Sequence, residues 1–155
     1  MTNKIDIPSK VEEVRLVYQS KTRANERPKV SSPKEAFNIL MKAWDMDQIE
    51  LLEECKVLLL DRSLRLMSVA SISKGGVAGT FVDPKIIFAM ALKRRATGII
   101  LAHNHPSGNL KPSSVDIQLT RKFRAAGMIL DIKVEDHLIV TPDRQYTSLV
   151  CDGFV

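Results

Sequence analysis

The chain has 155 residues, of which 45% are hydrophobic and 26% are charged, and its formal net charge is +5. This composition is typical of a soluble globular protein of one domain and excludes disordered and fibrous classes. No apolar run reaches the roughly 18 residues of a membrane-spanning helix, and residues 1–16 lack the apolar stretch of a signal peptide. The sequence therefore predicts a cytoplasmic protein that does not enter a membrane.

Cysteine content and charge narrow the possible sites further. Only Cys55 and Cys151 are present, so neither a disulfide framework nor a cysteine zinc cluster is expected, and a metal would need histidine and carboxylate ligands. The positive charge permits binding to nucleic acid. However, the basic residues are spread over several stretches with acidic or apolar neighbours, which a solvated surface explains more simply.

In chain order, the first predicted element is a strand over residues 11–19, where apolar and polar residues alternate imperfectly. A polar, basic loop follows, so residues 1–31 are interpreted as an N-terminal strand and arm, and residues 32–155 as the main domain. Ser32 as N-cap, with Pro33 and Glu35 after it, predicts the start of a helix. The expected buried stripe of this helix consists of Ala36, Ile39, Leu40, Ala43 and Trp44.

The middle of the chain predicts strands on either side of a second helix. Residues 53–61 form an apolar run typical of a central strand, and residues 64–73 are predicted to return as its antiparallel partner. The glycine-rich residues 74–83 predict a bend and a further extended piece. An Asp-Pro pair opens a helix over residues 83–96, and residues 97–105 indicate a strand buried on both faces.

After a Pro-Ser-Gly turn, Ser113 or Ser114 is predicted to open a helix that Gly127 ends. Residues 128–141 predict two more short strands, and residues 145–150 a last one. Helices that alternate with strands, together with hairpin-like pairs, predict an α/β fold in which helices cover a mixed sheet.

The stretch HNHPSGNLKPSSVD, residues 103–116, carries the most specific chemical signal. Residues two apart on a strand face the same side, so His103 and His105 can present two imidazoles to one point. Asp116 lies in the first turn of the following helix. Two nitrogens and one oxygen leave a fourth tetrahedral position for water, as in a catalytic zinc site, where zinc lowers the pKa of that water to roughly 7.

Several other interpretations apply to the same residues. Ser113 and Asp116 form an S-x-x-D capping box, so both could serve only the helix start, and the two histidines could be ordinary surface residues. The combination of two same-face histidines with a nearby carboxylate favours the metal site. A nuclease of the type named after the letters H-N-H draws its residues from separate elements, which excludes it here. His137 precedes an apolar strand and is interpreted as a structural histidine.

His103, His105, Ser113 and Asp116 match the pattern H-x-H-x7-S-x2-D, which resembles that of the JAB/MPN (JAMM) metalloenzymes. The fuller string LAHNHPSGNLKPSSVDIQLT is similar to the RadC branch, the bacterial proteins historically labelled DNA repair proteins, over about residues 32–155. The resemblance implies an α-β-α sandwich with a mixed sheet, similar to cytidine deaminases. It implies that His103, His105 and Asp116 bind Zn²⁺, and that Ser113 hydrogen-bonds the oxyanion or the zinc-bound water.

The family also uses a glutamate as general base at the start of a central strand, and here Glu53 and Glu54 are adjacent. The RadC pattern of an acid eight residues before the Asp that ends the strand selects Glu53. On a strand Glu53 shares a face with Cys55 and Val57, whereas Glu54 faces away. Both glutamates could instead be solvated charges.

The resemblance implies a zinc-dependent hydrolase that cleaves a peptide or isopeptide amide bond of a peptide or protein substrate. An alternative is a DNA-associated accessory protein whose domain binds partners and catalyses little. Longer RadC proteins carry a helix-hairpin-helix region that is not expected here, which weakens inherited DNA binding. A zinc nuclease is a third alternative, but phosphodiester hydrolysis commonly uses paired metals and more carboxylates. The sequence does not indicate an oligomeric state.

Overall fold

A five-stranded mixed sheet forms the centre of the molecule in the computed structural model, which describes residues 11–12, 14–75 and 82–155. The strands lie in the order β2-β1-β3-β4-β5; β3 and β4 are parallel and the other neighbouring pairs are antiparallel. Their bounds are β1 Glu54–Leu60, β2 Leu66–Lys74, β3 Gly98–Asn104, β4 Lys133–Val140 and β5 Tyr146–Ser148.

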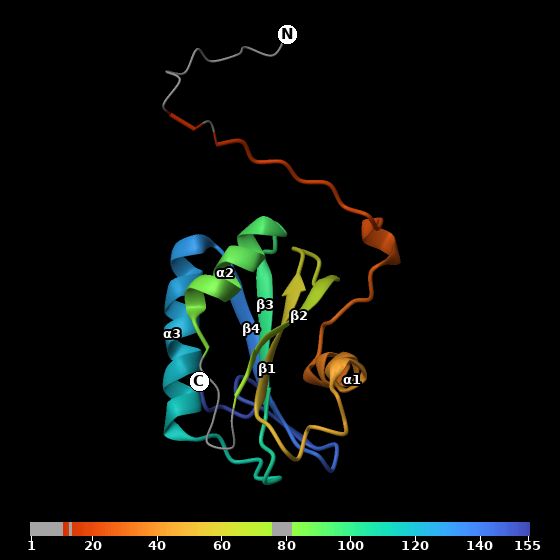
Figure 1. Ribbon diagram of the computed structural model, residues 1–155, viewed down its shortest axis with the longest axis vertical. Coiled ribbons are helices and arrows are strands. Elements are labelled where there is room, and N and C mark those ends of the chain that lie inside the picture. Colours follow the sequence, from red (N-terminus) through yellow and green to blue (C-terminus); the bar gives the residue numbers. More distant parts are fainter. Residues whose placement is uncertain (1–10, 13, 76–81) are drawn as a thin grey trace.

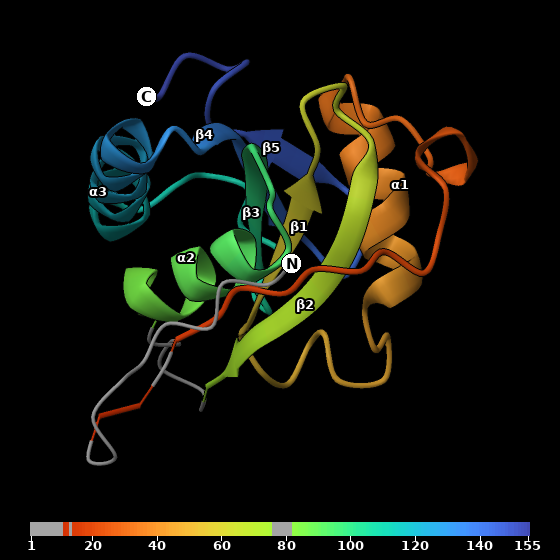
Figure 2. The same ribbon diagram turned by 90° about the horizontal axis from the view of Figure 1, so that it is seen from above.

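The helices cover both faces of this sheet (Figures 1 and 2). Helix α1, Pro33–Ala43, packs on one face, and α2, Pro84–Lys93, and α3, Ser114–Leu130, lie on the other. A short 3-10 helix, η1, spans Ala24–Glu26. The arrangement confirms the predicted α/β sandwich with a mixed sheet.

Strands β1 and β3 are buried along their whole length because each faces a helical layer on both sides. Successive side chains of a strand point to opposite faces. Val57 and Leu59 therefore pack against α2 and α3, while Leu58 and Leu60 pack against α1. Continuous apolar runs in the sequence correctly predicted these two central strands.

The predicted starts of the first two helices are also confirmed. The Ser32 side chain accepts a hydrogen bond from the Glu35 N–H, and Asp83 accepts one from Lys85, each with a proline at the first helical position. The predicted buried stripe of α1 needs one correction. Ala43 is exposed, and Phe37 and Met41 are buried in its place.

The predicted N-terminal strand is wrong for the described residues 11–12 and 14–19, which form no regular element. Val14 and Leu16 are 88% and 96% exposed, and the segment runs away from the sheet in Figure 1. Alternation stabilises a strand only when a neighbouring strand pairs with it. The further extended piece predicted over residues 74–83 falls largely on residues 76–81, outside the described chain.

Helix α3 continues past Gly127 to Leu130, so the predicted helix end is wrong. Asp131 supplies the left-handed residue that ends the helix, with a φ of 53°. Residues 128–130 are consequently helical, and one strand, β4, replaces the two that were predicted. The predicted last strand is confirmed as β5.

None of the helices in the described part of the chain combines the length and apolarity that a membrane span requires.

The two cysteines differ in accessibility, which gives a first prediction. Cys55 is 3% exposed in β1, and burial, reinforced by the Glu53 charge, raises the pKa of its thiol to about 12, whereas Cys151 is exposed. A disulfide-exchange reagent at pH 8 is therefore expected to modify Cys151 rapidly and Cys55 only after local opening, because the thiolate is the reactive form. Absorbance of the released chromophore, before and after adding denaturant, measures this. Cys151→Ser should remove the fast phase, and two fast thiols would contradict the burial of Cys55.

Candidate metal centre

Strand β3 and the residue after it position the two histidines. His103 lies opposite Cys55 of β1, on the face covered by α3, and is 4% exposed. His105 follows the strand, and its N–H donates to the Val140 carbonyl oxygen at 3.0 Å. The two Nε2 atoms lie 3.0 Å apart. The strand geometry thus brings both imidazoles to one point, as predicted.

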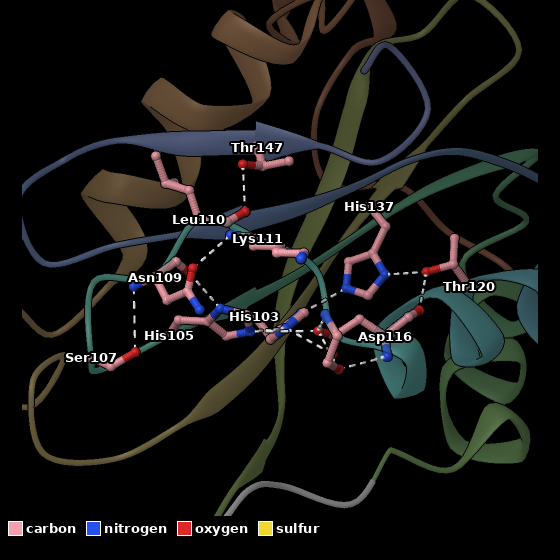
Figure 3. Close-up of polar contacts among 11 residues, drawn as sticks. His103, His105, Ser107, Asn109, Leu110, Lys111, Asp116, Thr120, His137 and Thr147 are labelled. Atoms are coloured by element: carbon pink, nitrogen blue, oxygen red, sulfur yellow. Dashed lines mark hydrogen bonds and ion pairs between the residues drawn. The ribbon is translucent and has the colours of Figure 1, made fainter. Parts of the chain in front are cut away.

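The first turn of α3 brings Asp116 to the same point (Figure 3). Its Oδ1 lies 3.2 Å from His103 Nε2, and its Oδ2 lies 3.6 Å from His105 Nε2. One ligand atom from each of the three residues lies within 4.8 Å of the other two, so the group could hold a metal ion. Two imidazole nitrogens and one carboxylate oxygen fit the donors that zinc takes in open catalytic sites.

Ser113 holds the Asp116 carboxylate through a capping box. Its N–H and its hydroxyl both donate to Oδ2 at 2.7 Å, while its Oγ accepts from the Asp116 N–H at 3.1 Å. The capping interpretation of S-x-x-D is therefore correct for the helix start. It also orients a candidate ligand, because the same bonds leave Asp116 Oδ1 directed at His103.

The loop between β3 and α3 determines which nitrogen of His105 is free. His105 Nδ1 lies 2.6 Å from the Asn109 carbonyl oxygen, which can only accept, so Nδ1 carries the proton and Nε2 has the lone pair. Hydrogen bonds hold this loop in place. Thr147 of β5 donates to the Leu110 carbonyl oxygen at 2.8 Å, and the Lys111 N–H donates to the Asn109 side chain at 3.0 Å (Figure 3).

Charge within the cluster favours a bound cation. Burial raises the pKa of Asp116, but the His103 and His105 imidazoles beside the carboxylate outweigh burial and hold the pKa well below its usual value. The hydrogen bond to Asp116 raises the pKa of His105 against the opposing effect of burial, and the Asn109 carbonyl and the Glu53 charge add to the increase. The carboxylate is therefore ionised over the physiological range and supplies negative charge for a bound cation.

The two candidate glutamates lie in different surroundings. Glu53 is half-buried just before β1 and lines an open cavity of about 810 Å³ together with His105 and Ser113. Glu54 is 6% exposed on the other side of the strand, where it pairs with Lys56 at 2.9 Å and Lys74 at 3.0 Å. Burial raises the pKa of Glu54, but hydrogen bonds and charges of the two lysines outweigh it and lower the pKa. Of the two candidates, Glu53 is therefore the one that lines this cavity with His105, and Glu50 lines it as well.

Asn104, between the two histidines, supports the chain around Glu53, a role that the sequence analysis missed. The strand turns its side chain away from the cluster, and it is fully buried. Its amide nitrogen donates to the carbonyl oxygens of Ile49 and Leu52, both at 2.8 Å, and its oxygen accepts from the Glu54 N–H at 2.6 Å. The two histidines of the His-Asn-His string thus face the cluster. The asparagine between them faces the other way and holds the backbone on either side of Glu53.

His137 and Thr120 contact the cluster from behind. His137 Nε2 lies 2.8 Å from His103 Nδ1, and its Nδ1 lies 2.6 Å from Thr120 Oγ1. The sequence analysis assigned His137 a structural role and did not single out Thr120. Their positions depend on the pairing of β4 with β3 and on the way α3 packs, which no short motif encodes.

Comparisons with known proteins agree with this architecture. A family model described as RadC-like JAB domain matches residues 30–154. The chain is similar to a UPF0758 protein of Flavobacterium johnsoniae, with 46% identity over 126 residues, which are 81% of this chain and 53% of the relative. A UPF0758 protein of Desulforudis audaxviator is 37% identical over 151 residues, 94% of this chain and 64% of the relative. The chain spans about half to two thirds of the length of these relatives.

Proposed function

The chain belongs to the RadC-like JAB domain family, and on this premise we propose that it is a zinc-dependent hydrolase of a peptide or isopeptide amide bond. The observation that carries the proposal is the convergence of His103, His105 and Asp116 within 4.8 Å, beside a cavity that Glu53 also lines. The donors match an open zinc site. The cavity provides room for an extended substrate next to these donors.

His103 and His105 would hold zinc through Nε2, and Asp116 through its carboxylate. When bound, zinc would polarise the scissile carbonyl and make a water molecule acidic enough to attack near pH 7. Glu53 would accept the proton of the attacking water and deliver it to the leaving amine, which needs a carboxylate in the cavity that is not itself a ligand. Ser113 would stabilise the oxyanion. To do so, its hydroxyl would stop donating to the Asp116 carboxylate and donate to the oxyanion instead.

Metal content tests this proposal. Protein purified without added zinc, then incubated with zinc and desalted, is expected to carry about one zinc per chain by elemental analysis. Asp116→Asn, which can still accept the Ser113 N–H, and His105→Ala should each lose most of this zinc, because each removes one of three ligands. Lys111→Ala is the control, because it changes a residue of the loop between β3 and α3 without removing a candidate ligand. This variant should retain its zinc. Equal zinc content in Asp116→Asn and wild type would overturn the proposed site.

A further inference from the structure

We propose that Thr120 and His137 are positioning residues that fix the tautomer of His103 and thereby leave its Nε2 lone pair free. The role toward zinc rests on the proposed function, whereas the tautomer itself does not. Neither residue belongs to the group that could hold a metal ion. Both are buried behind it, where Thr120 is 0% and His137 2% exposed.

A continuous chain of hydrogen bonds links the backbone of Asp116 to the ring of His103 (Figure 3). Thr120 Oγ1 lies 2.7 Å from the main-chain carbonyl oxygen of Asp116, one helical turn earlier, and 2.6 Å from His137 Nδ1. His137 Nε2 then lies 2.8 Å from His103 Nδ1. Thr120 of α3 and His137 of β4 thus form a hydrogen-bonded link between two candidate ligands, Asp116 and His103.

The carbonyl oxygen at the end of this chain determines its direction. A carbonyl can only accept, so the single hydroxyl proton of Thr120 lies between Thr120 and Asp116. Thr120 Oγ1 must then accept from His137, which places the His137 proton on Nδ1 and leaves Nε2 as an acceptor. His103 in turn donates from Nδ1 to His137. The lone pair of His103 therefore lies on Nε2, 3.2 Å from Asp116 Oδ1.

This direction requires a neutral His137 ring, and its surroundings supply that condition. His137 is 2% exposed, and its two ring nitrogens lie against a hydroxyl and another imidazole rather than a carboxylate, so a positive charge on this ring would be buried without an opposite charge beside it. A neutral ring has one N–H, so the two ends of His137 cannot both donate. The reverse tautomer would place a proton on His103 Nε2, at the position where a ligand needs its lone pair. Second partners of this kind orient metal-binding histidines and typically change metal affinity by about 10- to 100-fold.

The experiment compares Thr120→Val, which keeps the shape and removes the hydroxyl, with Thr120→Ser, which keeps the hydroxyl. Long-range proton–nitrogen NMR of the metal-free proteins at pH 8 reports which ring nitrogen of each histidine carries the proton. We expect protons on Nδ1 of His103 and His137 in wild type and Thr120→Ser. In Thr120→Val, His137 loses its acceptor, and both rings should shift toward the Nε2–H form. Zinc affinity, measured by competition with a chromophoric chelator, should fall about 10- to 100-fold in Thr120→Val only.

The two readouts separate this inference from the proposed function. Nε2–H on His103 in the wild-type protein would overturn the inference without any variant. Unchanged tautomers and unchanged zinc affinity in a folded Thr120→Val protein would also overturn it. If wild type shows the expected tautomers but binds no zinc, the proposed function fails and the tautomer assignment stands. Melting temperatures of the metal-free variants identify any general loss of structure.

Discussion

Glu53→Gln is expected to lower kcat/KM of the zinc-loaded protein by about 10²- to 10⁴-fold, the usual effect of losing a general base. Glutamine keeps the size of the side chain but cannot accept a proton from water. Zinc content should remain at the wild-type level, since Glu53 lines the cavity with His105 but is not in the ligand group. Release of fluorophore from a pooled library of peptide amides and isopeptide-linked peptides measures the rate, and elemental analysis measures the zinc.

Glu54→Gln is the matched control, because it makes the same chemical change one residue away and on the other side of the strand. Its carboxylate balances Lys56, which is 4% exposed, and Lys74. Breaking a buried pair typically costs 3–5 kcal/mol, and the half-exposed Lys74 favours the lower end, about 3 kcal/mol, in urea unfolding. The rate per folded, zinc-loaded molecule should not change. If Glu54→Gln alone lost activity, Glu54 and not Glu53 would be the general base.

The candidate ligands could be predicted because their geometry is local. His103 and His105 share a face through strand periodicity, and a capped helix start fixes Asp116 near them, so each step involves neighbouring residues. The choice of Glu53 over Glu54 rested on the resemblance to the RadC pattern, and strand periodicity agreed with it. The register of β1 against β3, which places Cys55 opposite His103, agrees with that choice.

The supporting residues could not be predicted because they depend on long-range pairing. His137 reaches His103 only because β4 runs parallel to β3, with His137 opposite Leu101 and Ile139 opposite His103. Asn104 contacts the segment before β1 through bonds that span about 50 residues. A polar side chain within a buried strand indicates that partners exist, since unpaired buried polar groups are costly. It does not indicate which residues supply them.

The two wrong element assignments have a common physical reason. The alternation of apolar and polar residues over 11–19 and the glycine at position 127 are local patterns. Whether each gives the predicted structure depends on the elements that pack against it in the fold. The described residues 11–12 and 14–19 pair with no strand, so their exposed apolar side chains do not form one. A glycine near a helix end commonly supplies the left-handed residue, but Asp131 takes that conformation here. Gly127 must therefore serve another purpose.

Gly127→Ala is expected to lower the free energy of unfolding by about 3 kcal/mol, the upper part of the usual range for overpacking. A Cβ at this position would lie 2.2 Å from the Ile132 carbonyl oxygen and 3.6 Å from the ring of Phe88. The Ile132 N–H also donates to the Gly127 carbonyl oxygen at 2.9 Å, so the backbone of the turn cannot move away without losing this bond. Urea unfolding of metal-free protein, followed by far-UV circular dichroism, measures the effect.

Ala125→Gly tests the reason for this effect, because the same pair of residues is exchanged at an exposed position of the same helix. In an ordinary helical position alanine is more stabilising than glycine by about 1 kcal/mol, so Ala125→Gly should destabilise the protein by that amount. Helix propensity alone would make Gly127→Ala stabilising. A loss of stability at both positions therefore shows that close packing of α3 on Ile132, just before β4, outweighs propensity at Gly127. Wild-type stability in Gly127→Ala would mean that the helix end can separate from Ile132. In that case the turn between α3 and β4 would not require the absence of a side chain at Gly127.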